Sequence, residues 1–191
     1  MIDFNITLEN NNILLRPMQH SDIEAYYKVT DPKPMWVYFA HDLSLLSELK
    51  QWVNTALQQK EQHERLPFTV IEKSTGKVIG SSSFGNISYR DSRLEIGWTW
   101  LAKESQGKGI NHQVKQLMLD YGFETLNMQR IEFKTDVLNL AARNALIKIG
   151  CIEEGVLRSH TLMVNNRRRD TIYYSILKSE WPGVKQKNKW T

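Results

Sequence analysis

A short glycine-containing segment has the residue types and the position needed to bind an anion. It reads Gln106-Gly107-Lys108-Gly109-Ile110-Asn111 and lies between a strand pattern and an amphipathic helix pattern. Glycines let the backbone approach a ligand closely, and free amides at the positive end of a helix dipole favour phosphate oxygens. The geometry suits a pyrophosphate, although glycine pairs are also common in purely structural turns.

Two well-known phosphate motifs do not fit this segment. A nucleotide P-loop needs Ser or Thr after its lysine, but Lys108 is followed by Gly109, and no glycine stands at the required distance upstream. The dinucleotide pattern needs a third glycine where His112 stands. The segment therefore predicts a pyrophosphate site of another class.

The segment resembles the signature of the GNAT acetyltransferase superfamily: Arg or Gln, two residues, Gly, one residue, then Gly or Ala. Gln106 opens the motif here, and Asn111 departs from its closing Gly or Ala. Residues 95–101 look like the family's central strand, whose exposed backbone pairs with the pantetheine arm of acetyl-coenzyme A (acetyl-CoA). Residues 135–151 resemble its second motif, and 154–177 resemble the RimJ/RimL branch in particular. The likeness extends from about Ile13 to Trp181.

This resemblance implies that acetyl-CoA is the acetyl donor and that two groups of residues contact it. Asn139 would bond the pantetheine amide, and it could also cap the helix that follows. The expected contacts are Trp98, Thr99, Trp100, Leu101, Gln106, Gly107, Lys108, Gly109, Ile110, Asn111, Asn139, Arg143 and Asn144.

Acetyl transfer to an amine needs a base, because an ammonium has no lone pair with which to attack. Glu95 is the candidate base, since related histone-type acetyltransferases carry a glutamate at the same offset from the glycine loop. Its alternative role is a surface carboxylate paired with Lys or Arg. Leu146 and Ala142 stand where family members carry a tyrosine and a serine, so the acid for the leaving thiolate is unassigned, with Tyr173 as a substitute. A backbone amide near residues 98–100 would polarise the thioester oxygen.

The acceptor side is marked by an aromatic segment, 34–41, and by the turn around 165–166, which should flank the acceptor channel. Trp36, Tyr38 and His41 could line the acceptor pocket or form core under the first two helices. The RimJ/RimL likeness suggests a protein N-terminal amine as acceptor, and a small-molecule amine competes with it. A non-catalytic acyl-CoA-binding or ribosome-associated module is the alternative from another functional class.

The elements that must position these residues follow from periodicity and turn signals. They predict a mixed α/β fold in the order β α α β β β α β α β β, with the sheet covered by helices. A capping box, Ser21 to Glu24, should start the first helix, and Ser44 should cap the second. Alternation along 94–100 places Glu95 opposite Leu94, Ile96 and Trp98. The other predicted elements are strands at 13–17, 68–72, 77–84, 131–134, 152–162 and 168–177, and helices from Leu45, over 110–126 and over 141–149, the last stopped by Gly150.

Composition bounds the remaining possibilities. The chain of 191 residues, 41% hydrophobic and 24% charged, predicts one domain over 1–191, with a core of about 12–181 and a basic tail of about 183–191. The single Cys151 excludes an intrachain disulfide and fits the cytoplasm. No apolar run approaches the roughly 20 residues of a membrane span. Scattered histidines predict no metal site, and the net charge of +4 without a nucleic-acid motif argues against nucleic acid. The sequence does not decide whether the protein forms a homodimer.

Overall fold

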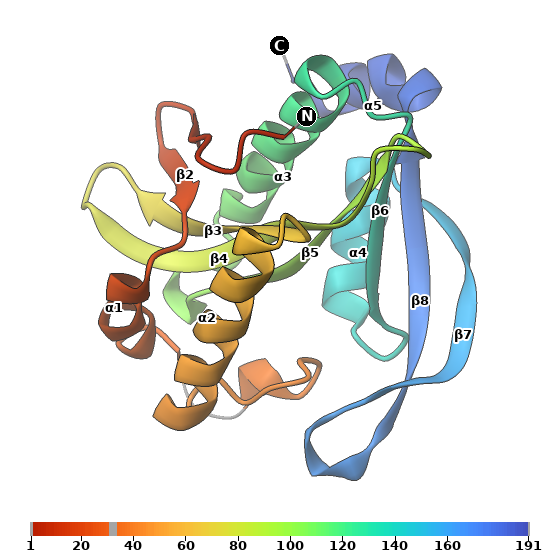
Figure 1. Cartoon of the computed structure of the whole chain (residues 1–191). Coiled ribbons are helices and arrows are strands. Elements are labelled where there is room, and N and C mark those ends of the chain that lie inside the picture. Colours follow the sequence, from red (N-terminus) through yellow and green to blue (C-terminus); the bar gives the residue numbers. More distant parts are fainter. Residues whose placement is uncertain (1, 31–33, 191) are drawn as a thin grey trace.

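An eight-stranded sheet runs through the molecule in the computed structural model, which describes residues 2–30 and 34–190 (Figure 1). The strand order is β1-β2-β3-β4-β5-β6-β8-β7, and every neighbouring pair is antiparallel except β5 and β6. The strands are β1 (Leu8–Glu9), β2 (Ile13–Pro17), β3 (Arg65–Glu72), β4 (Lys77–Ser88), β5 (Arg93–Leu101), β6 (Arg130–Asp136), β7 (Ile152–Leu162) and β8 (Arg168–Leu177). The predicted mixed α/β fold is confirmed.

Helices cover both faces of this sheet (Figure 1). They are α1 (Ile23–Tyr27), α2 (Leu46–Glu61), α3 (Ile110–Asp120), which continues as a π-helical turn (Tyr121–Thr125), α4 (Leu140–Ile149) and α5 (Trp181–Asn188). On one face Leu94 and Ile96 pack in a core cluster with Val114 of α3 and Ile149 of α4. On the other face a second cluster joins α1 and α2 to Trp100 of β5. The central strand β5 therefore lies between two cores.

A β-bulge interrupts β5 at the point where the alternation should continue. Ser81 pairs with Trp100 and Ser83 with Gly97, so β5 has one residue more than β4 in this interval. Trp98 adopts a φ of 52°, and its ring lies against Gly85, the pairing partner of Glu95. Trp98 thus shares the face of Glu95, and the prediction that the two lie on opposite faces is wrong. A strict period of two cannot continue through an inserted residue.

The parallel neighbours β5 and β6 pair over a short distance only. Their register runs from Arg93 opposite Arg130 to Glu95 opposite Glu132 and ends there. Beyond Glu95, the described partner of β5 is β4 alone. The two parallel strands therefore diverge into a fork whose closed end is the Glu95–Glu132 pair, with the bulge on one arm.

Two predicted helix caps differ in the structure. The turn before α1 is capped by Asp22, whose carboxylate accepts the Gln19 amide at 2.8 Å, so Ser21 and Glu24 do not form the box. Ser44 donates to Asp42 at 2.6 Å, and Leu45 occupies the N-cap position of α2. Asp22 also accepts hydrogen bonds from other elements, and long-range partners of that kind outweigh a local cap signal.

Residues 183–188 of the predicted basic tail belong to helix α5, which begins at Trp181, and Lys189 is the C-cap residue of that helix. Trp181 and Trp190 are buried in the core cluster on the α3 side of the sheet. Asn188 donates to the Ile149 carbonyl at 2.6 Å and lies 3.0 Å from His112 Nε2. The tail thus packs on the start of α3. Among the described residues no helix is both long and apolar enough to cross a membrane.

Candidate functional site

The glycine segment connects the open end of the β5 arm to α3. Gly107 and Gly109 have φ values of +73° and +77°, a region that strongly favours glycine. A Cβ added at either position would meet no atom within 4 Å. The backbone conformation therefore accounts for the glycines, and the space beside them is free for a ligand. The Gln106 side chain holds the segment against β5 by donating to the Leu101 carbonyl at 2.9 Å.

The first turn of α3 presents amide groups that have no acceptor within the helix. Gly109 is the N-cap residue and has no side chain, and the first intrahelical bond runs from the Gln113 amide to the Gly109 carbonyl at 3.2 Å. The amides of residues 110–112 are therefore available to an anion at the positive end of the helix dipole. The Asn111 side-chain oxygen is buried without a hydrogen-bond partner among the described residues. These features fit a pyrophosphate group followed by a polar chain, as acetyl-CoA would supply.

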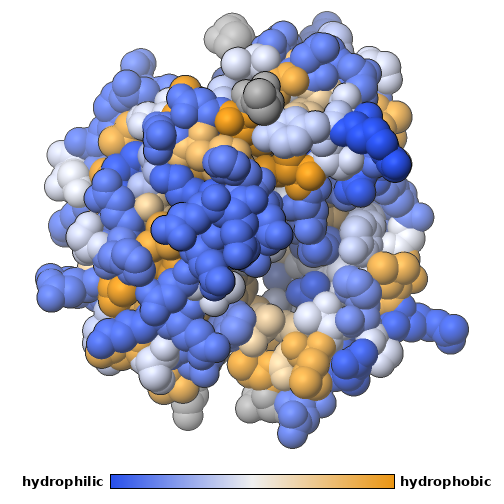
Figure 2. All heavy atoms as spheres, viewed as in Figure 1, coloured by the Kyte–Doolittle hydropathy of each residue, from blue (hydrophilic) through white to orange (hydrophobic). Residues whose placement is uncertain are grey.

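A pocket of about 740 Å³ opens next to the closed end of the fork. Figure 2 shows the surface hollowed between the half of the molecule that carries α2 and the half that carries β8. The lining residues are His63, Glu64, Asn86, Ile87, Ser88, Arg93, Glu95, Glu132 and Tyr173. The structure therefore brings together Glu95 and Tyr173, which lie far apart in the sequence. Trp36, Tyr38 and His41 are not among the lining residues.

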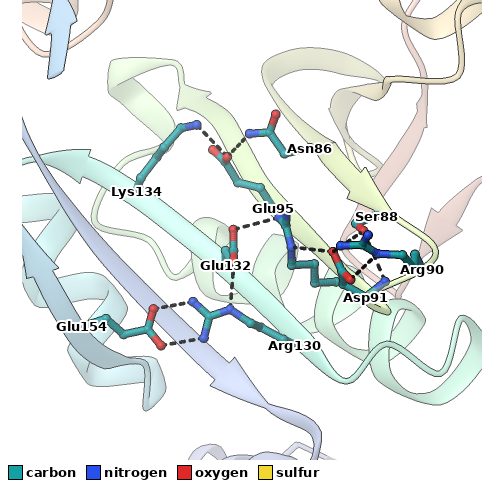
Figure 3. Close-up of polar contacts among 10 residues, drawn as sticks. Asn86, Ser88, Arg90, Asp91, Glu95, Arg130, Glu132, Lys134 and Glu154 are labelled. Atoms are coloured by element: carbon teal, nitrogen blue, oxygen red, sulfur yellow. Dashed lines mark hydrogen bonds and ion pairs between the residues drawn. The ribbon is translucent and has the colours of Figure 1, made fainter. Parts of the chain in front are cut away.

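Glu95 is held in this pocket by two neighbours (Figure 3). The residue is only 3% exposed, and its Oε2 accepts a hydrogen bond from Asn86 Nδ2 at 2.5 Å and forms an ion pair with Lys134, whose Nζ lies 2.8 Å away. Asn86 reaches it from a bulged part of β4, in a left-handed conformation that asparagine tolerates. A Cβ at Gly97 would lie 2.7 Å from Oε1, so glycine at that position leaves room for this oxygen. The carboxylate is ion-paired, which the alternative role as a surface carboxylate predicted. It is also buried and lines a pocket, which that role did not predict.

Further charges form a network along the same face of the sheet (Figure 3). Arg130 Nε donates to Glu132 at 2.8 Å, and its other nitrogens bind Glu154. Arg93 lies 3.7 Å from Glu132. Charged residues alternate with apolar ones along β6, but this pattern alone does not predict the network. Which charges pair was decided by the neighbouring strands.

The second group of residues predicted to contact acetyl-CoA lies at the start of α4. Asn139 caps the helix by accepting the Ala142 amide at 3.1 Å, which confirms that part of its expected role. Arg143 donates to Tyr174 Oη at 3.1 Å and to the Val137 carbonyl at 3.0 Å, so it ties α4 to β8. Asn144 is exposed. That Asn139, Arg143 and Asn144 contact acetyl-CoA stays a prediction.

One contact joins the aromatic segment to the β7–β8 turn, and that the two segments flank an acceptor channel stays a prediction. Arg167 Nη2 is 3.5 Å from the Val37 carbonyl, and it also binds the buried Asp136. Tyr38 is half-buried, and His41 Nδ1 lies 3.3 Å from Glu48. Trp36, in contrast, is 1% exposed and packs edge-on against Trp100, with ring centroids 5.5 Å apart. Trp36 is therefore a core residue, which was the alternative to a place in the acceptor pocket.

Trp36→Ala is therefore expected to lower the free energy of unfolding by about 3–5 kcal/mol, the usual cost of emptying a large aromatic site. Urea unfolding followed by circular dichroism measures it. Val37→Ala is the matched control, because Val37 is 48% exposed and its truncation should cost less than about 0.5 kcal/mol. If Trp36→Ala left the stability unchanged and raised the KM for the amine, Trp36 would be assigned to the acceptor pocket and not to the core.

Lys115 is a buried residue near the fork that the sequence analysis did not single out. It is 4% exposed, and its Nζ donates to Thr99 Oγ1 at 2.7 Å. Burial lowers the pKa of this ammonium to about 7. A signal was present in the sequence, because the helical period places Lys115 between Met118 and Leu119, two apolar residues of the same helix. Within residues 2–30 and 34–190, no group of three or more His, Cys, Asp or Glu residues could hold a metal ion.

Comparisons with known proteins establish the family of this chain. The profile of the acetyltransferase (GNAT) domain matches residues 12–152. An uncharacterized N-acetyltransferase, p20 of Bacillus licheniformis, is 32% identical over 93% of this chain and 99% of its own length. The putative ribosomal N-acetyltransferase YdaF of Bacillus subtilis is 38% identical over 58% of this chain and 59% of its own length, which is consistent with a RimJ/RimL-like branch. A putative acetyltransferase from T. thermophilus superposes with a TM-score of 0.87 at 26% identity, covering 99% of this chain and 98% of that one. The chain belongs to the GNAT acetyltransferase family and is an N-acetyltransferase.

Proposed function

We propose that this N-acetyltransferase transfers the acetyl group of acetyl-CoA directly to a primary amine while both substrates are bound. The observation that carries the proposal is the position of Glu95. Its buried carboxylate lines the 740 Å³ pocket and also marks the closed end of the β5–β6 fork. An amine in the pocket and a thioester in the fork would therefore meet beside a base.

Backbone groups of the protein would hold acetyl-CoA. The amides of residues 110–112 would bind its pyrophosphate, and the β5 backbone beyond Glu95, which has no described partner on the β6 side, would pair with the pantetheine arm. A backbone amide in the bulged segment 98–100 would polarise the thioester carbonyl. Acetyl-CoA supplies the activated acetyl group, and the protein orients it.

Glu95 would take a proton from the acceptor ammonium, directly or through water, and so expose the attacking lone pair. Lys134 and Asn86 bind the same oxygen, Oε2, and this fixes the carboxylate while Oε1 can receive the proton. Tyr173 lines the same pocket from β8 and stays a proposed proton donor for the leaving thiolate.

The pocket walls favour a cationic amine as the acceptor. Glu64, Glu95 and Glu132 contribute carboxylates to the lining, and Arg93 contributes a guanidinium. The opening between the two halves of the molecule could admit a small-molecule amine or an extended protein N-terminus (Figure 2). The likeness to a putative ribosomal N-acetyltransferase supports the second acceptor class.

Incubation with acetyl-CoA, a panel of amines and ribosomal proteins, followed by mass spectrometry, tests this function. We expect a mass gain of one acetyl group on at least one primary amine and release of free CoA. Binding of acetyl-CoA without turnover on any acceptor would favour the non-catalytic module instead. Release of CoA with the acetyl group on a hydroxyl would overturn the amine assignment.

A further inference from the structure

The Lys115 side chain extends from α3 toward the fork between the two parallel strands. Thr99, which accepts its hydrogen bond, lies in the bulge of β5. Phe133, whose ring centroid is 5.7 Å from the Lys115 Nζ, follows the last β5–β6 pair on β6. The ammonium thus approaches both arms of the fork from the α3 side of the sheet, just beyond its closed end.

The surroundings of this ammonium do not explain why a lysine is present. None of the ion pairs found among the described residues includes Lys115. The ionisable groups that act on it are Cys151, which precedes β7, and Glu95 on β5, and Glu95 Oε2 already binds Lys134. Burying an ammonium with one hydroxyl as its polar partner is costly, and an apolar side chain of similar length would fill the space without that cost. Such a residue near a reaction site indicates function.

We propose that the Lys115 ammonium, in place of the Tyr173 hydroxyl on the pocket side, stabilises and protonates the CoA thiolate that acetyl transfer releases. The proposal rests on the proposed function, which places the thioester in the fork. As the carbon–nitrogen bond forms, the carbon–sulfur bond breaks and its electron pair stays on sulfur. Lys115 Nζ gives a proton to sulfur and regains one from solvent. The two protons that the acceptor ammonium loses pass to Glu95 and to water, so one proton is released per turnover.

Lys115→Met removes the charge at nearly constant length, and Lys115→Arg keeps it. We expect Lys115→Met to lower kcat by about tenfold to a hundredfold, less than a complete oxyanion hole supplies, because a thiolate is a tolerable leaving group. The direct measurement is the ultraviolet titration of the thiol of enzyme-bound CoA. Wild-type protein should hold the pKa of that thiol below the usual value of about 8.5, Lys115→Met should raise it by about one unit or more, and Lys115→Arg should restore part of the shift.

Stability provides an independent measurement. Because burial lowers the pKa of Lys115, the folded state binds fewer protons than the unfolded state between about pH 7 and the unfolded value near 10.4. Wild-type stability should therefore rise with pH in this window relative to Lys115→Met. At pH 6 the variant should be the more stable protein. Lys50→Met, on the exposed side of α2, is the control and should change neither kcat nor this pH dependence.

The outcomes separate the two proposals. If wild-type protein binds and turns over acetyl-CoA while Lys115→Met keeps its kcat and the pKa of the bound thiol, Lys115 has no role in thiolate release and this inference alone is wrong. If wild-type protein binds no CoA, the proposed function falls and this inference falls with it. Should Lys115→Met fail to fold, Thr99→Val tests the same point, since it removes the hydrogen bond that positions Nζ. An unchanged pKa of the bound thiol in Thr99→Val would likewise overturn the inference.

Discussion

Glu95→Gln should lower kcat by about a hundredfold to ten-thousandfold near neutral pH, the usual contribution of a general base, while leaving acetyl-CoA affinity unchanged. Glutamine keeps the shape of the side chain, and its carbonyl oxygen can still accept the hydrogen bond from Asn86 and face the Lys134 ammonium. It cannot accept a proton. The defect should shrink at higher pH, where more of the acceptor is already a free amine. Steady-state kinetics over a range of pH values, with calorimetric titration of acetyl-CoA, measures both effects.

Glu64→Gln is the control for pocket charge, because Glu64 lines the same pocket but is exposed. It should raise the KM for a cationic amine and change kcat by less than about threefold, since no proton transfer is assigned to it. A fall in kcat of less than about threefold for Glu95→Gln, with the wild-type pH profile, would leave Glu95 as a structural ion-pair partner of Lys134.

Gly109→Val should abolish measurable acetyl-CoA binding in a calorimetric titration. The valine side chain would occupy the open space beside the first-turn amides of α3, where the pyrophosphate is proposed to lie. Valine at a φ of +77° also strains the backbone, at a cost of about 1–2 kcal/mol. The experiment must therefore separate lost binding from lost stability.

Gly76→Val provides that separation. Gly76 lies in the β3–β4 turn with a φ of +68°, and a Cβ there would also meet no atom within 4 Å. It should show a similar loss of stability with normal acetyl-CoA affinity. If Gly109→Val kept wild-type affinity, the pyrophosphate would have to bind elsewhere.

Structural features that depend on a few consecutive residues were predictable from the sequence. The cap at Asn139 and the helix stop at Gly150 depend on local backbone preferences, and the structure has both of them. The hairpin of β3 and β4 and the pairing of β7 with β8 follow from period-two runs and the turns between them. The family resemblance rests on the same local patterns.

Tertiary structure alone decided how the candidate site is assembled. The bulge at Trp98 depends on pairing between β5 and β4, so the period of β5 could not predict which face Trp98 occupies. The partners of Glu95 come from β4 and β6, and the approach of Lys115 to Thr99 joins α3 to β5. Periodicity states which side of its own element a residue occupies, whereas these contacts depend on how separate elements pack. The sequence by itself therefore determined most of the elements and the conformation-limited glycine loop, and the packing of the sheet determined which charges meet at the fork.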